Sequence, residues 1–137
     1  ELLDQEIGKG KIVFKKLGRT ITFQDSCRLS RFEGRPDLPR RLIARLRQDD
    51  FVEMPDHGRA AICCGNSAWT GCDAYSKALQ VRRLEQARET GSDLLVTSCP
   101  KCQIHLKCAM EDPFREDAIK MDLMDLTGVL ARTIGWE

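Results

Sequence analysis

The chain has 137 residues, with 22 lysines and arginines against 21 aspartates and glutamates, so its formal net charge is +1 at pH 7. This balance excludes a strongly basic surface for nucleic acid, and no run of about 18 apolar residues exists that could span a membrane. The N-terminus also lacks the basic and apolar segments of a secretory signal, so we expect one domain, located in the cytoplasm.

Residues 1–18 are expected to form a connector. The chain begins with Glu1 and not with methionine, so we expect further sequence upstream of it. Residues 19–137 are then expected to form the folded domain.

The first expected strand covers residues 19–26. Ile21 and Phe23 alternate with threonines, which is typical of a strand. Cys27 follows directly, so the first cysteine is expected at the end of a strand.

A helix is expected within residues 36–48, with Asp37 as its candidate N-cap. Its apolar stripe at helical spacing consists of Leu38, Leu42 and Leu46. The arginines between these positions are expected to face water.

The paired cysteines are expected directly after a second short apolar segment. Residues 51–54 are a candidate short strand, and residues 60–62 are apolar and lead into Cys63 and Cys64. Gly65 comes next, and a glycine can take a left-handed or closely packed conformation there.

The second half of the chain begins with a helix from Asp73 to about Glu89, which Gly91 ends. Its expected buried face consists of Ala74, Ala78, Val81 and Leu84. A continuous apolar strand at residues 93–98 follows and leads to Cys99.

Three more elements are expected: a short helix at residues 101–110, an edge strand at 119–121 and an amphipathic helix at 122–135. Strands and helices thus alternate along the chain. This alternation favours an α/β fold with a mainly parallel sheet flanked by helices, in which the carboxyl ends of the strands share one edge.

The sequence contains seven cysteines: Cys27, Cys63, Cys64, Cys72, Cys99, Cys102 and Cys108. An odd number cannot all pair within one chain. In a reducing compartment, clustered thiols are more often metal ligands or redox groups than disulfides. The spacing of the cysteines therefore carries the functional information.

Five of these cysteines follow expected strands: Cys27, Cys63, Cys64, Cys99 and Cys102. Open α/β sheets bind ligands at the carboxyl edge of their strands, so we expect the five thiols to share one site there. A thiolate-rich site selects iron–sulfur clusters, zinc or copper(I), and five sulfurs exceed the four that tetrahedral zinc uses. Two adjacent cysteines also suit a larger group better than one ion, so a cluster is favoured.

The segments TITFQDSCRLSR, AICCG and DLLVTSCPKCQIHL resemble the cysteine-rich CCG domain found in the B and D subunits of the heterodisulfide reductase family. The resemblance covers about residues 19–135. It implies that the five motif cysteines ligate a noncubane [4Fe–4S] cluster in an oxidoreductase subunit that passes electrons to a disulfide or thiol. It further implies partner subunits with iron–sulfur or flavin centres, and a place in the cytoplasm or on the cytoplasmic side of a membrane complex.

Two features depart from the family pattern. The usual CCGxGG is CCGNSAW in this chain, and the family's B subunit has two such modules where this chain has one. Two alternatives to disulfide reduction therefore remain: a domain that only relays electrons, and a zinc-binding structural or docking module. A thioredoxin-like CxxC exchanger fits poorly, because it leaves the other motif cysteines without a role.

Four residues outside the motif are further candidates. His105 lies one helical turn after Cys102, so it is a candidate to donate to a cluster sulfur or to return a proton to a leaving thiol, although such a histidine can also be only a packed residue. Cys72 and Cys108 are off the pattern and are expected to be ordinary thiols. Trp69 either lines the site or belongs to the core.

Overall fold

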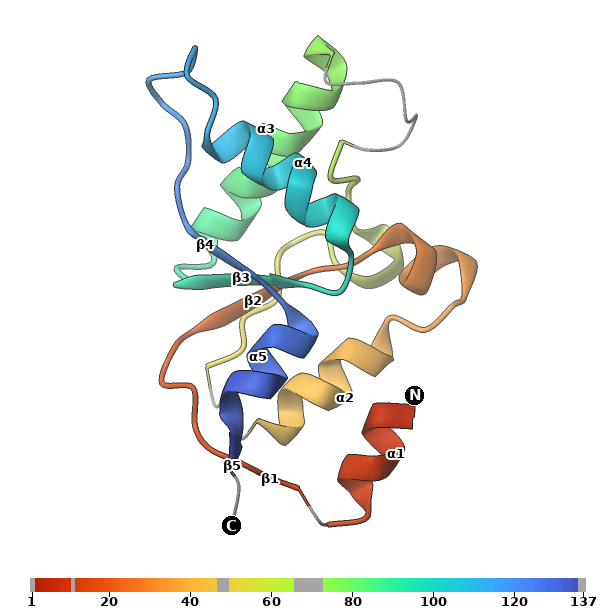
Figure 1. Ribbon diagram of the computed structural model, residues 1–137. Helices are drawn as coiled ribbons and strands as arrows, with labels where there is room; N and C mark the ends of the chain where they lie inside the picture. The colour runs from red at the N-terminus through yellow and green to blue at the C-terminus, as the bar shows by residue number, and fades with distance from the viewer. Residues whose placement is uncertain (1, 11, 47–49, 66–72, 136–137) are drawn as a thin grey trace.

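The computed structural model describes residues 2–10, 12–46, 50–65 and 73–135. Its centre is a three-stranded parallel sheet in the order β2-β3-β4 (Figure 1). The strands are β2 (Ile21–Gln24), β3 (Leu94–Thr97) and β4 (Asp122–Asp125). The predicted α/β class with a parallel sheet is therefore confirmed.

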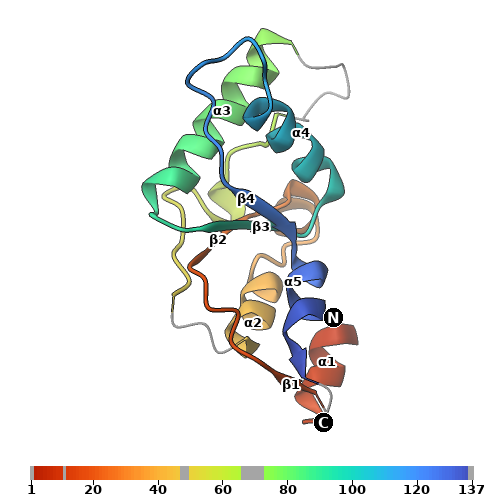
Figure 2. The same ribbon diagram turned by 60° about the vertical axis from the view of Figure 1, so that its left-hand side comes forward.

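Helices cover both faces of the sheet, as the two views show (Figures 1 and 2). One face carries α3 (Ala74–Glu89) and α4 (Pro100–Met110). The other carries α2 (Asp37–Arg45) and α5 (Leu126–Thr133). None of the helices in the described ranges has the length and apolar character needed to cross a membrane.

The middle strand β3 is buried on both faces, which explains why its first three residues are all apolar. Leu94 and Val96 point into a first core with α2 and α5, whereas Leu95 points into a second core with α3 and α4. Alternate side chains of one strand thus join two cores. The second core also contains Cys64 and Cys102.

The segment before the sheet contains α1 (Leu2–Gly8) and β1 (Val13–Phe14). Strand β1 pairs antiparallel with β5 (Ile134–Gly135) near the end of the described chain. Ile7 is buried in the first core. The expected connector therefore packs against the domain.

Two expected elements near the sheet differ in the structure. The candidate strand at residues 51–54 is reduced to one isolated bridge between Ile21 and Phe51. The edge strand is not at residues 119–121 but three residues later, at β4, and α5 begins only at Leu126. Pairing with β3 fixes this register, since Leu95 lies opposite Leu123.

The expected buried face of α3 is confirmed only at Leu84, which is buried, and at Val81, which packs partly buried against the second core. Ala74 and Ala78 are exposed, and the buried positions of this helix are mainly polar. Helix α2 differs in a similar way, because Arg40 points inward rather than into water. Its N-cap position is Pro36 and not Asp37, and no side chain caps it.

Candidate functional site

Cys27 follows β2 and precedes a π-helical turn, η1 (Arg28–Phe32). The backbone N–H and the hydroxyl of Ser30 both donate to the carbonyl oxygen of Ser26 at 2.9 Å, which holds the turn against the strand end. Cys27 is exposed in this conformation. Single π-helical turns of this kind are frequent at functional sites.

Cys63 and Cys64 lie on the loop that follows the short 3-10 turn η2 (Gly58–Ala60). Arg31 of η1 donates from Nε to the carbonyl oxygen of Arg59 at 3.0 Å and from Nη2 to that of Ala61. One side chain thus ties the turn after Cys27 to the loop with the paired cysteines. Of this pair, Cys63 is half-buried and Cys64 is buried.

Gly65 is required by the close approach of this loop to α3. Its φ is +87°, and an added Cβ would lie 2.6 Å from the backbone oxygen of Ser76 and 2.8 Å from Cγ of Gln80. A side chain at this position would therefore need both a left-handed backbone and a shift of the helix. Because Gly65 allows this close approach, the paired cysteines before it can pack at the second core.

Replacing Gly65 with alanine is expected to destabilise the protein by about 2–4 kcal/mol, from left-handed strain plus overpacking. Gly91→Ala is the matched control, because Gly91 has φ +71° but nothing within 4 Å of an added Cβ. It should cost only the strain, roughly 1–2 kcal/mol. Urea denaturation of both variants measures the difference, and equal losses would contradict the packing argument.

Cys99 and Cys102 are held at the start of α4. Cys99 is the N-cap residue with an extended backbone, and its carbonyl oxygen accepts from the N–H of Gln103 at 3.1 Å. Pro100 occupies the first turn, where the missing N–H costs nothing. Cys102, three residues along, is 3% exposed.

The structure brings four of the five motif cysteines to one small pocket at the carboxyl end of β2. The residues that line it are Cys27, Cys63, Cys64, Cys102, Gln24, Asp25, Ser30, Ala61 and Ile62. Cys99 is not among them but packs, half-buried, against the second core with Cys64 and Cys102. Within the described ranges, no set of three or more His, Cys, Asp or Glu side chains could hold a metal ion as they stand.

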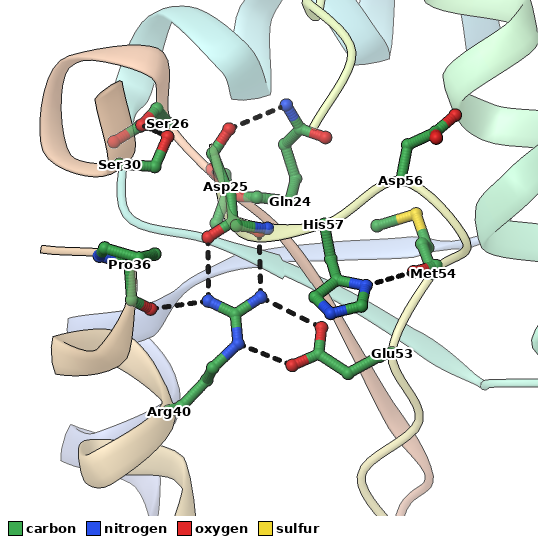
Figure 3. A network of polar contacts seen from close by, with 12 residues as sticks. Gln24, Asp25, Ser26, Ser30, Pro36, Arg40, Glu53, Met54, Asp56 and His57 are labelled. Atoms are coloured by element: carbon green, nitrogen blue, oxygen red, sulfur yellow. Dashed lines mark hydrogen bonds and ion pairs between the residues drawn. The ribbon is translucent and has the colours of Figure 1, made fainter. Parts of the chain in front are cut away.

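Beside this pocket lies a partly buried ion-pair network centred on the buried Asp25 (Figure 3). Arg40 donates from Nη1 and Nη2 to the two carboxylate oxygens of Asp25 at 2.8 and 2.9 Å, and from Nη2 to Glu53 at 2.9 Å. Asp25 also accepts from the backbone N–H of Gly58 at 2.7 Å. The hydrogen bond to Asp25 raises the pKa of Arg40 above its ordinary value. No sequence pattern singled out Asp25, although it lies two residues before Cys27.

The remaining candidate residues lie elsewhere. His105 is half-buried on α4, with Nδ1 3.3 Å from Nε2 of Gln80, and it does not line the pocket. Cys108 is half-buried, with its sulfur 3.4 Å from Nζ of Lys77. Cys72 and Trp69 lie outside the described residues.

Comparison with known proteins connects this site to a family. The cysteine-rich domain named CCG matches residues 21–107, which include the five motif cysteines. No solved structure matches the chain.

Several curated proteins are similar over most of the chain. The B subunit of a fumarate reductase (CoM/CoB) from Methanothermobacter marburgensis is 29% identical over 84% of the chain and 23% of that protein. The D subunit of a dihydromethanophenazine:CoB–CoM heterodisulfide reductase from Methanosarcina barkeri is 30% identical over 82% of the chain and 28% of that protein. An iron–sulfur protein of Methanococcus maripaludis is 28% identical over 91% of the chain and 26% of that protein. The chain thus spans about a quarter of the length of these relatives.

Proposed function

Because the chain belongs to the family of cysteine-rich CCG domains, we propose that it binds an iron–sulfur cluster and passes electrons to a disulfide or thiol. The proposed ligands are Cys27, Cys63, Cys64, Cys99 and Cys102. The observation that carries this proposal is the meeting of Cys27, the paired cysteines and Cys102 at one pocket, from segments far apart in the sequence. The proposed form is a noncubane [4Fe–4S] cluster, because adjacent cysteines suit a group larger than one ion.

Two buried donors near the cysteines support the fit of such a group. The hydroxyl of Ser98, next to Cys99, and Nη2 of Arg83 are both buried and have no hydrogen-bond partner among the described residues. Buried donors are normally satisfied, and thiolate and sulfide sulfurs are acceptors. An all-thiolate site is also the donor set that iron–sulfur clusters use.

When bound, the cluster would supply single electrons at potentials that overlap those of disulfide couples. The chain's own residues set the access to it. The exposed Cys27 gives the proposed site a solvent-accessible edge, where a disulfide or thiol could approach, whereas Cys64 and Cys102 are buried. In this proposal His105 returns a proton to a leaving thiol.

The names of the relatives extend the proposal to partners. Subunits of a heterodisulfide reductase and of a fumarate reductase are similar to this chain. We therefore place the domain in a larger redox assembly that delivers electrons from partner iron–sulfur or flavin centres, in the cytoplasm, where thiols remain reduced.

The test is anaerobic reconstitution of the full chain with iron and sulfide, followed by metal analysis and electron paramagnetic resonance. We expect bound iron and sulfide, visible absorption, and a new paramagnetic signal when the oxidised protein is titrated with a small thiol. An intact cluster without any thiol-induced signal would favour a pure electron relay. A colourless protein that binds zinc in preference to iron would overturn the proposal in favour of a structural module.

A further inference from the structure

The inward face of α3 carries a buried charge beside the cysteine pocket. Arg83 is 0% exposed and is the largest fully buried side chain among the described residues. A buried charge is costly unless it is paired, so an arginine at this position requires a reason. The buried side of α3 thus combines Arg83 with the apolar Leu84 and Ala87 of the second core.

Three of the donors of Arg83 have acceptors. Its Nε donates to Oε1 of Gln24, and its Nη1 donates to the carbonyl oxygen of Asp56 at 2.6 Å and to Oε1 of Gln86 at 2.7 Å. Gln86 in turn donates to the carboxylate of Asp56 at 2.6 Å. Nη2 is buried without any acceptor in the described part of the chain. These hydrogen bonds hold the guanidinium in place but leave one end unsatisfied.

The hydrogen bond to Gln24 places this guanidinium directly behind the wall of the cysteine pocket. Gln24, its acceptor, lines the same pocket as Cys102. Burial lowers the pKa of Arg83 to about 10, while the negative charges of Asp25 and Asp56 oppose this effect. Arg83 thus keeps its positive charge at neutral pH, and its acceptor Gln24 lines the pocket that Cys102 also lines.

We propose that Arg83 is a positioning residue for the bound cluster, with its Nη2 donating a hydrogen bond to the sulfur of Cys102 or to a cluster sulfide. Its charge then favours the reduced, more negative state of the cluster. An arginine with only a structural role is expected to have acceptors for all of its buried N–H groups, whereas Nη2 of Arg83 has none among the described residues. The inference rests on the proposed cluster-binding function.

The test compares Arg83→Lys with Arg83→Met in the reconstituted full chain. Both variants lose the hydrogen bonds of the guanidinium, so any structural effect of that loss is common to them. Only the lysine variant keeps a positive charge. Arg82→Met, at an exposed position of the same helix, is the control for a charge change that should leave the potential unchanged. The readout is the midpoint potential of the cluster, measured by redox titration at mildly acidic pH, which keeps the lysine protonated.

We expect the methionine variant to be about tenfold harder to reduce than the lysine variant, which for one electron corresponds to about 59 mV. Loss of iron from the methionine variant alone would also support the proposal. Equal potentials in two variants with intact clusters would overturn it.

A second measurement needs no variant. In the wild-type chain labelled with ¹⁵N in the arginine guanidinium groups, pulsed paramagnetic resonance should show a nitrogen coupled to the cluster spin. The absence of such coupling in a paramagnetic cluster would overturn the hydrogen bond. A wild-type chain that binds no iron would instead overturn the proposed function, and this result is seen before any variant is made.

Discussion

Replacing Cys64 with serine is expected to remove most of the iron that the reconstituted protein binds. Cys64 is 5% exposed and belongs to the second core together with Cys102, so no other described thiol can replace it without moving that core. A hydroxyl is a poor ligand for a site that selects soft donors. The loss of iron affinity should exceed the roughly 10- to 100-fold effect that outer-shell changes have at metal sites. Iron and sulfide per chain, determined anaerobically, measure it.

Cys108→Ser is the matched control, because Cys108 is half-buried on α4 and contacts Lys77 rather than the pocket. It should keep its iron. The free energy of unfolding of the metal-free proteins provides a second control. It should fall by only about 1–3 kcal/mol in Cys64→Ser, which is the cost of burying a hydroxyl at position 64. Full iron content in Cys64→Ser would contradict its assignment as a ligand.

Strands β2 and β3, and the edge at which the cysteines gather, could be predicted because local sequence determines them. Strand β3 is apolar at Leu94, Leu95 and Val96, and this follows directly from its burial on both faces. The short parallel strands then bring Cys27 and Cys99 to the same end of the sheet, since β2 and β3 run in register. Neither step needs knowledge of distant contacts.

The polar interior could not be predicted, because its partners come from distant segments. Arg83 donates to Gln24, 59 residues earlier in the chain, and Arg40 pairs with Asp25, 15 residues earlier. Hydrophobic periodicity assigns charged residues to the surface, so it placed Ala74 and Ala78 of α3 inside and the arginines of α2, Arg40 among them, outside. An aspartate two residues before a motif cysteine was the one local signal available for this network.

The position of the edge strand could not be predicted for a related reason. The sequence DLMD in β4 contains two acidic residues, and its side chains are exposed or half-buried. An edge strand tolerates such residues, whereas local propensity favours the apolar IKM segment just before it. Pairing of Leu123 with Leu95 decides the register instead.

Replacing Arg40 with methionine is expected to destabilise the protein by about 3–5 kcal/mol, the usual cost of removing one partner from a buried ion pair. The side chain of Asp25 is 1% exposed, and that of Arg40 is 21% exposed. Without Arg40, the carboxylate of Asp25 would keep only the N–H of Gly58 among its described donors. The free energy of unfolding in urea, measured on the metal-free chain with reduced thiols, gives the effect.

Arg41→Met provides the comparison on the same helix. Arg41 is 48% exposed and pairs with Asp37 at 3.1 Å and with Asp4 at 3.2 Å, so its loss should cost no more than about 1 kcal/mol.

A double-mutant cycle with Asp25→Asn tests the mechanism of the Arg40 effect, because removing both charges should cost less than the sum of the single changes. Additive effects would show that Arg40 stabilises the fold by packing over Phe23, whose ring centre lies 5.8 Å from its guanidinium carbon, and not by neutralising Asp25. Because Asp25 lines the cysteine pocket, a non-additive result would also mean that the wall of the site depends on this ion pair.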